Sequence, residues 1–417
     1  MIHRRGFLSR PLAMFVIVAA AFSAGILVER SGRILAPYQY TPAGMESTFA
    51  PFWQTWDAVQ RHYVDREAVN PERMTRAAIE GMLASLGDPG HTTYLPPEDR
   101  KSLESALAGS VEGIGIRMNF AGRKPSVLYT VAGSPARAAG LRSGDQLLEV
   151  NGKDVRGMSP DRIAALVRGP LEGKVHIRVL RPGQPQTLAF DIARAKVDVP
   201  DVAWSMLPGL PIAHLAIESF GDKVHDQLKA ALEEIRKKGA KGIVLDLRGN
   251  QGGIKDQAVT VSSEFLKDGN VFLERDANGN QIAVPVREGA SAADIPVCLL
   301  IDGGTASSAE IVAGALQDHG RGKLIGTHTL GFGTLLQRFV LIDNSAVLIA
   351  VAEWLTPNGR RIWRQGIAPD IVVNLPDGAS VMLPEMEGDL AAAGSAGKIE
   401  DKQLLKAIEI LKEQIHP

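Results

Sequence analysis

A serine at the start of a predicted helix is the residue of this sequence best placed to do chemistry. The small residues GGTASSA lead into an apolar pattern at helical spacing through Ile311, Val312 and Leu316, which predicts a tight turn followed by a helix. Free N–H groups and the positive end of the helix dipole at such a start would stabilise a developing oxyanion. Ser307 and Ser308 are the candidates, and the alternative is that one of them only caps the helix.

The segment around these serines carries a resemblance. GTASSAEIVAGALQD is similar to the nucleophile segment of the carboxyl-terminal processing peptidases, or tail-specific proteases, in which a serine lies three residues before a glutamate. This resemblance implies Ser307 as the nucleophile and Glu310 as a supporting residue. The next segment, RGKLIGTHTLGFGTLLQ, resembles the family segment that carries a lysine and then a glutamine. Matched without gaps, those two positions hold Phe332 and Leu336.

Phenylalanine at the lysine position removes the general base that the resemblance implies. In the family, desolvation lowers the pKa of the lysine, so that its neutral amine takes the proton of the serine hydroxyl. Phenylalanine accepts no proton, and loss of one member of a serine-based catalytic unit lowers the rate by roughly a thousandfold to a millionfold. His328 and Gln337 are the nearest residues in the sequence that could replace the lost groups.

Residues 197–376 alternate between apolar strand patterns and helical patterns, which predicts an α/β fold with a parallel sheet. LDLRGNQGG resembles the family segment LDLRxNxGG, whose last glycine supplies an oxyanion N–H. The resemblance therefore implies a crotonase-like βαβ peptidase core in which the N–H groups of Gly253 and Ser308 form the oxyanion hole. The tail at 377–417 contains an amphipathic helix that we expect to pack on this core.

Residues 110–193 resemble a PDZ domain, and an ordinary small β domain is the alternative. GIGI at 113–116 matches the carboxylate-binding loop of that fold, and the run SPARAAGLRSGD matches its next segment. Loop N–H groups would receive the terminal carboxylate of a peptide, while the peptide backbone adds a strand to the sheet edge. The resemblance implies a peptide-binding site formed by Gly113, Ile114, Gly115, Ile116, Ile163, Leu166 and Val167.

Residues 1–30 combine basic residues with the apolar run LAMFVIVAAAFSAGILV, which is just long enough to cross a bilayer as a helix. The preceding basic residues predict a single-pass protein of the cell membrane with the bulk of the chain outside the cytoplasm, periplasmic or extracellular. AFSAG is compatible with signal peptidase, so a cleaved signal peptide is the alternative.

Residues 42–107 follow as a predicted helical region. Phe52, Trp53, Trp56, Val59 and Tyr63 share one apolar face of it, and we expect that face to belong to a core.

Composition excludes several classes of function. A net charge of −1 over 417 residues gives no nucleic-acid footprint. The single cysteine, Cys298, lies in the apolar run IPVCLLI and predicts a buried strand thiol. Neither a CxxC nor an HExxH pattern occurs, so the sequence gives no support to a metal site, and serine chemistry implies no cofactor.

Two functions remain open. The first is an exported serine-type endopeptidase that recognises protein C-termini through its PDZ domain and cleaves through an acyl-enzyme. The second is a catalytically inactive pseudopeptidase, tethered to the membrane, that acts as a scaffold or regulator by binding C-termini. The sequence carries no signal for the oligomeric state.

Overall fold

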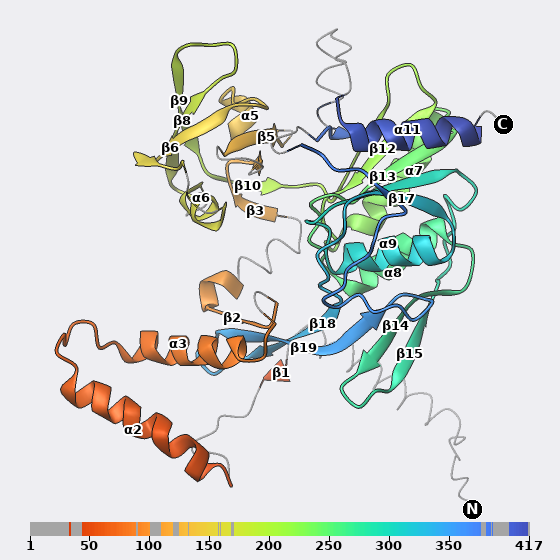
Figure 1. Cartoon of the computed structure of the whole chain (residues 1–417). Helices are drawn as coiled ribbons and strands as arrows, with labels where there is room; N and C mark the ends of the chain where they lie inside the picture. Colours follow the sequence, from red (N-terminus) through yellow and green to blue (C-terminus); the bar gives the residue numbers. More distant parts are fainter. Residues whose placement is uncertain are drawn as a thin grey trace, which may run out of the picture. The chain divides into compact units, whose positions relative to one another are not determined.

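The computed structural model describes the chain as two compact units, residues Met1–Lys101 with Leu335–Val351 and residues Ser102–Thr334 with Ala352–Pro417 (Figure 1). The predicted membrane segment at 1–30 lies outside the described residues. Within the described part of the chain, no helix combines the length and the apolar character needed to cross a bilayer. The described residues are 33–34, 44–88, 91–100, 110–119, 125–131, 133–156, 158, 160–167, 171–376, 381–384, 386 and 400–415.

The described part of the first unit contains helices α2 and α3 and short strands before and after them. Asn70 caps the second helix, because its side chain accepts a hydrogen bond from the Arg73 N–H at 2.8 Å and Pro71 occupies the first helical position. Strands β18 and β19 are neighbours in one sheet. The elements are β1 (Arg33–Ile34), α2 (Glu46–His62), α3 (Pro71–Ala84), β2 (Thr93–Leu95) and, apart from their ends at 334 and 352–355, β18 (Thr334–Val340) and β19 (Ala346–Leu355).

The aromatic face of α2 is not a core. The helix has no buried residue, and 53% of Trp53 and 50% of Tyr63 are exposed. The rings of Phe52 and Trp53 instead contact each other edge to face, with centroids 5.0 Å apart. The predicted burial is wrong because helical spacing shows which side chains share a face but not what covers that face.

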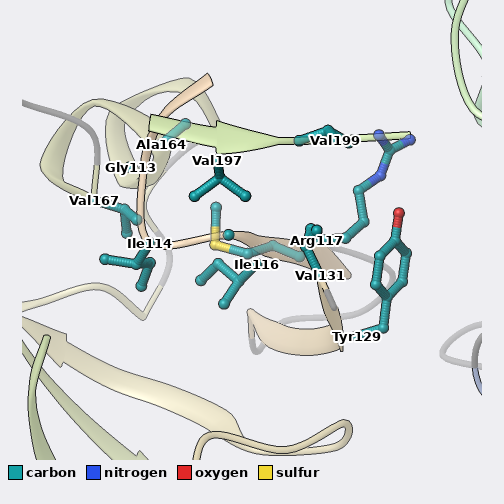
Figure 2. A pocket seen from close by; sticks show the side chains of 12 residues that line it. Gly113, Ile114, Ile116, Arg117, Tyr129, Val131, Ala164, Val167, Val197 and Val199 are labelled. Atoms are coloured by element: carbon teal, nitrogen blue, oxygen red, sulfur yellow. The ribbon is translucent and has the colours of Figure 1, made fainter. Parts of the chain in front are cut away.

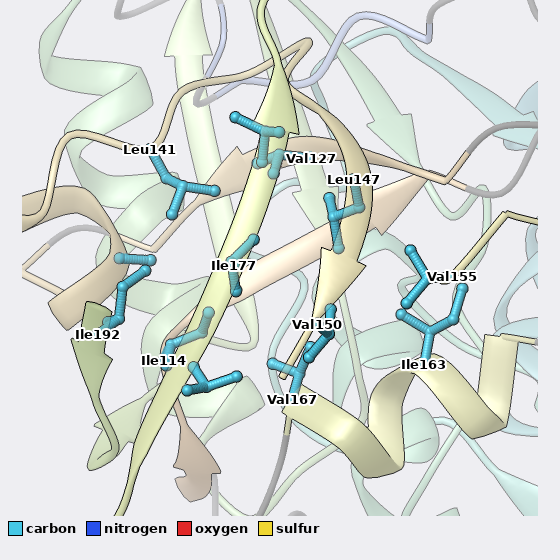
Figure 3. Close-up of a cluster of buried hydrophobic side chains, with 13 residues drawn as sticks. Ile114, Val127, Leu141, Leu147, Val150, Val155, Ile163, Val167, Ile177 and Ile192 are labelled. Atoms are coloured by element: carbon cyan, nitrogen blue, oxygen red, sulfur yellow. The ribbon is translucent and has the colours of Figure 1, made fainter. Parts of the chain in front are cut away.

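A small antiparallel β domain with two short helices opens the second unit. Its main sheet has the order β4-β5-β6-β8-β9, with β7 beside β6, while β3 pairs with β10. Side chains alternate between buried and half-buried along β8, and Figure 3 shows the resulting core, which includes Leu147 and Ile177. The elements are β3 (Ser110–Gly113), β4 (Ile116–Asn119), β5 (Ser126–Thr130), α5 (Pro135–Ala138), β6 (Gln146–Val150), β7 (Lys153–Asp154), α6 (Pro160–Val167), β8 (Lys174–Leu180), β9 (Thr187–Ala193) and β10 (Ala195–Asp198).

A six-stranded sheet of order β11-β12-β13-β16-β17-β20 follows in the second unit (Figure 1). β11 and β12 are antiparallel and every later pair is parallel. All residues of β12, β13 and β16 are buried, as expected for parallel strands covered on both faces, so the predicted parallel core is confirmed. The strands are β11 (Val202–Met206), β12 (Ile212–Ile217), β13 (Gly242–Asp246), β16 (Val297–Ile301), β17 (Gly322–Gly326) and β20 (Ile371–Val372).

Helix α11 (Lys402–Ile415) packs on one face of this sheet, where Leu404, Ile408 and Leu411 meet buried side chains such as Cys298. The predicted packing of the tail helix is therefore confirmed. Cys298 is buried in β16, as predicted, and this burial raises the pKa of its thiol to about 11. The remaining elements are α7 (Val224–Lys237), α8 (Lys255–Phe265), α9 (Ser308–Asp318) and the hairpin of β14 (Asn270–Asp276) and β15 (Gln281–Pro285).

Candidate active site

The turn between β16 and α9 holds Ser307 in an unusual backbone conformation. Ser307 is the N-cap residue of α9 and has φ +55° and ψ −120°, a left-handed φ that non-glycine residues rarely adopt. Two contacts tie this turn to the end of β13: the Ala306 N–H donates to the Asn250 carbonyl at 2.9 Å, and the Thr305 hydroxyl donates to the Leu247 carbonyl at 2.8 Å. A strained residue persists only where its surroundings fix it, and strained residues gather at functional sites.

Glycines after β13 allow the two turns to approach closely. A Cβ atom at Gly252 would lie 2.7 Å from the Cβ of Ser307 and 2.8 Å from the nitrogen of Ser308. The Ser308 hydroxyl donates to the Gly253 carbonyl at 3.1 Å. The structure thus brings together the predicted nucleophile, Ser307, and the two predicted oxyanion residues, Gly253 and Ser308.

The backbone N–H groups of Ser308 and Gly253, the two predicted oxyanion donors, make no hydrogen bond within a described helix or strand. Ser308 is the first residue of α9, whose opening N–H groups have no partner within the helix. For the Gly253 N–H, no acceptor occurs among the residues that the structure describes. The Gly252 N–H, in contrast, donates to the Asn250 side chain at 2.8 Å.

Glu310 joins the serine turn to a second loop. Its Oε2 accepts hydrogen bonds from the backbone N–H groups of Ser307 and Phe332, each at 2.9 Å. Its Oε1 accepts from the Gly331 N–H at 2.8 Å and from the Thr329 hydroxyl. Burial raises the pKa of the Glu310 carboxyl, although these four donors favour its charged form.

Phe332 therefore lies beside Ser307, because both backbone N–H groups contact the same oxygen. Its side chain is half-buried. Glycines flank it, and a Cβ atom at Gly333 would lie only 2.5 Å from the Cβ of Ile362. The loop that carries the predicted base position is thus packed tightly against the segment that follows β19.

Of the two residues proposed to replace the lost groups, His328 lies in the same unit as Ser307 and Gln337 lies in the other unit. His328 is exposed, and its ring lies close to Gly366. No hydrogen bond between His328 and Ser307 occurs within the described ranges. Leu336 and Gln337 are half-buried residues of β18 in the first unit.

A second candidate site is a groove of about 210 Å³ in the small β domain (Figure 2). Of the predicted peptide-binding residues, Gly113, Ile114, Gly115, Ile116 and Val167 line it. Two others do not, since Ile163 is fully buried in the domain core and Leu166 packs against that core. On α6 it is Ala164 that shares the groove face with Val167, three residues later, as the helical repeat requires.

One lining residue of this groove is charged. The guanidinium of Arg117 lies 3.5 Å from the carboxylate of Glu218, which follows β12. Burial raises the pKa of Glu218, while Arg117 opposes that shift. The rest of the lining is dominated by aliphatic side chains, so the groove suits an apolar ligand with a polar group at its end.

Comparison with known proteins gives two matching family models. The model for peptidase family S41 matches residues 211–373, and the model for the PDZ domain matches residues 127–181. The carboxy-terminal processing protease CtpA of Bacillus subtilis is 32% identical to this chain over 407 residues, which cover 96% of this chain and 86% of that protein. The chain belongs to peptidase family S41.

Two further relatives agree with this assignment. The carboxyl-terminal-processing protease of Synechocystis sp. is 33% identical to this chain, and the matched residues cover 78% of this chain and 76% of that protein. The photosystem II D1 C-terminal processing protease, whose structure is solved, is 30% identical in sequence to this chain. The two structures match over 78% of this chain and 93% of that chain, with a TM-score of 0.51. The predicted family and its PDZ domain are confirmed.

A buried ion-pair network, which the sequence analysis missed, supports the S41 core next to the serine turn. The Arg248 guanidinium donates to Asp246 at 2.6 Å and to Asp401, ahead of α11, at 2.7 Å, and all three side chains are almost fully buried. His214 also contacts Asp246, at 3.1 Å. Burial works against the charge of Asp246, but Arg248 and His214 outweigh it and lower its pKa. The signal was present in LDLR, where the two charged residues flank one buried leucine.

Among the residues that the structure describes, no cluster of three or more His, Cys, Asp or Glu side chains could hold a metal ion.

We expect Gly252→Ala to destabilise the chain more than Gly209→Ala. Both glycines have positive φ, +94° and +70°, so both alanines carry backbone strain of roughly 1–2 kcal/mol. Only at Gly252 does the new Cβ collide with Ser307, whereas nothing lies within 4 Å at Gly209. Overpacking should add about 1–3 kcal/mol to the loss for Gly252→Ala, measured by urea unfolding. Equal losses would contradict the close approach.

Arg248→Met should lower the free energy of unfolding by about 3–5 kcal/mol at pH 7, because it leaves Asp246 and Asp401 buried without their cation. In the native chain the pKa of Asp246 lies below its ordinary 3.8, so its stabilising contribution is present above that pH and is lost as the pH falls further. In the variant, protonation relieves an unpaired charge instead. The difference between the two chains should therefore shrink below about pH 4.

The control for this comparison is Arg76→Met, which breaks an exposed pair with Glu80. Exposed pairs contribute less than about 1 kcal/mol, so the control should unfold almost as the native chain does. A loss for Arg248→Met that is equally small, or that does not change with pH, would show that the network does not stabilise the core.

Proposed function

We propose that the chain is an exported serine-type endopeptidase that binds protein C-termini in its PDZ groove and cleaves a peptide bond with Ser307. The observation that carries the catalytic part is the positive φ of Ser307 at the start of α9, with Gly252 and Ser308 in close contact. Strand-to-helix turns with a strained serine present nucleophilic hydroxyls in other hydrolase folds. The names of the relatives, which are processing proteases, support the same function. Export rests on the apolar run in residues 1–30.

In the proposed reaction the Ser307 hydroxyl gives up its proton as its oxygen attacks the carbonyl carbon of the substrate. The bond to the leaving amine then breaks, the amine takes up that proton, and water hydrolyses the acyl-enzyme to a carboxylic acid and free Ser307. Negative charge develops on the carbonyl oxygen during the attack, and the N–H groups of Ser308 and Gly253 are the proposed donors to it. Glu310 acts as a positioning residue, since it contacts the backbone of Ser307 rather than its hydroxyl proton.

Phe332 is the observation that favours a second function, the binding of C-termini without turnover. It lies beside Ser307, where the family carries a lysine base, and its ring accepts no proton. The relatives lend this alternative no support, because they are named as proteases. Turnover in this chain requires another proton acceptor.

The test compares the full chain with its Ser307→Ala variant on unfolded casein between pH 5 and pH 10. We expect cleavage by the native chain and its loss in the variant, because alanine has no nucleophilic oxygen. A rate that rises with a midpoint near pH 6.5 would identify histidine as the base. If the two chains do not differ while both bind C-terminal peptides, the second function is correct.

Phe332→Lys, combined with Leu336→Gln, should raise the rate of cleavage at least tenfold, because it restores a base next to Ser307. The backbone hydrogen bond of residue 332 to Glu310 does not depend on the side chain, so the loop should keep its conformation. Phe332→Met, with Leu336→Gln, is the matched control, since methionine has a similar unbranched side chain without the amine. A folded lysine variant no faster than the methionine variant would show that the limiting defect lies elsewhere.

A further inference from the structure

One wall of the peptide groove comes from residues beyond the PDZ domain. The lining includes Val197 and Val199, which belong to β10 and to the linker that leads into the peptidase core. β10 pairs antiparallel with β3, with Ala195 opposite Gly113 and Val197 opposite Val111. Because β3 runs directly into the GIGI loop, this pairing fixes the linker next to the predicted carboxylate-binding loop.

Val197 lies directly over that loop. A Cβ atom at Gly115 would be 3.1 Å from Cγ1 of Val197 and 2.3 Å from the Cβ of Ser134. Gly115 is therefore held between the two side chains, and its φ of +74° is one that favours glycine. Figure 2 shows Val197 pointing from its strand into the space above Ile116.

Further packing holds Val197 in this position. Its side chain is 6% exposed and forms a buried cluster with Tyr129 and Val131 of the PDZ domain and with Leu383 of the C-terminal segment. Met386 and Val199 pack against the same cluster. The wall thus has side chains behind it and cannot move away from a ligand without disrupting that cluster.

The space that remains limits the ligand. A dry cavity of about 150 Å³ holds one benzene molecule, so a groove of about 210 Å³ is only somewhat larger. An extended peptide directs alternate side chains to the same face, so the terminal residue and the residue two positions before it share this space. Small aliphatic side chains fit there, while a bulky terminal side chain would meet Val197.

We propose that Val197 and Val199 are specificity-determining residues, which restrict the PDZ groove to C-termini that end in a small aliphatic residue. The preference is therefore set by the linker and not by the PDZ domain alone. This inference rests on the proposed binding of C-termini in the groove.

The experiment measures binding of fluorescent decapeptides that differ only in a terminal alanine or leucine, to the full chain carrying Ser307→Ala so that no peptide is cleaved. The native groove should bind the alanine peptide more tightly. Val197→Ala should shift the ratio of dissociation constants towards the leucine peptide on the order of tenfold, because it makes room for added methylene groups. Val197→Leu should shift the ratio in the opposite direction.

Val202→Ala is the matched control, since Val202 is similarly buried, at 9% exposure, but lies on β11 and does not line the groove. It should leave the ratio unchanged, and thermal unfolding of every variant checks that it is folded. A folded Val197→Ala chain with the native ratio would overturn this inference alone. If the native chain binds free and amidated peptides equally, or neither of them, C-terminal recognition itself is wrong and the inference falls with it.

Discussion

The buried carboxylate of Glu310 is the interaction on which the candidate active site depends. A carboxylate removed from water is strongly destabilising unless donors surround it. Its donors come from two separate segments, the backbone of Ser307 on one side and Thr329, Gly331 and Phe332 on the other. Only when both segments are in place is the charge satisfied, so the serine turn and the loop are positioned together.

Two further constraints act on the same edge of the sheet. Gly252 lets the turn after β13 approach Ser307 more closely than any side chain would permit. Arg248, four residues before Gly252, is held by Asp246 and by Asp401 ahead of α11. The C-terminal helix is therefore linked through buried charge to the turn that carries Gly253, although α11 covers a face of the sheet and not its edge. A buried network of this kind fixes the positions of its members, because any arrangement that leaves one of the buried polar groups without a partner is strongly destabilising.

Much of this was predictable from local patterns, and what was missed depended on tertiary contacts. Continuous apolar runs predicted the parallel core, because a strand covered on both faces needs apolar side chains on both. The helical spacing of apolar residues predicted the tail helix, because that spacing places them on the one side that packs. The motifs gave Ser307, Glu310 and Gly253, which the structure brings together. Periodicity could not show that α2 has no buried residue in the described part of the chain, or that Ile163 points into a core. Nor could it assign Val197 to the groove, because its wall forms only through pairing with β3.

The geometry of the site and its capacity for proton transfer are separate properties in this chain. Glu310 accepts a hydrogen bond from the backbone N–H of residue 332, and this hydrogen bond is the same for phenylalanine and for lysine. The hydrogen bonds from the Ser307 N–H and from the Ser308 hydroxyl do not use the side chain of residue 332, so they can persist with phenylalanine at that position. The PDZ groove is formed by segments other than the serine turn and the loop at Phe332, and these include the linker at Val197. Replacement of one side chain can thus change turnover while the scaffold and the groove keep their structure.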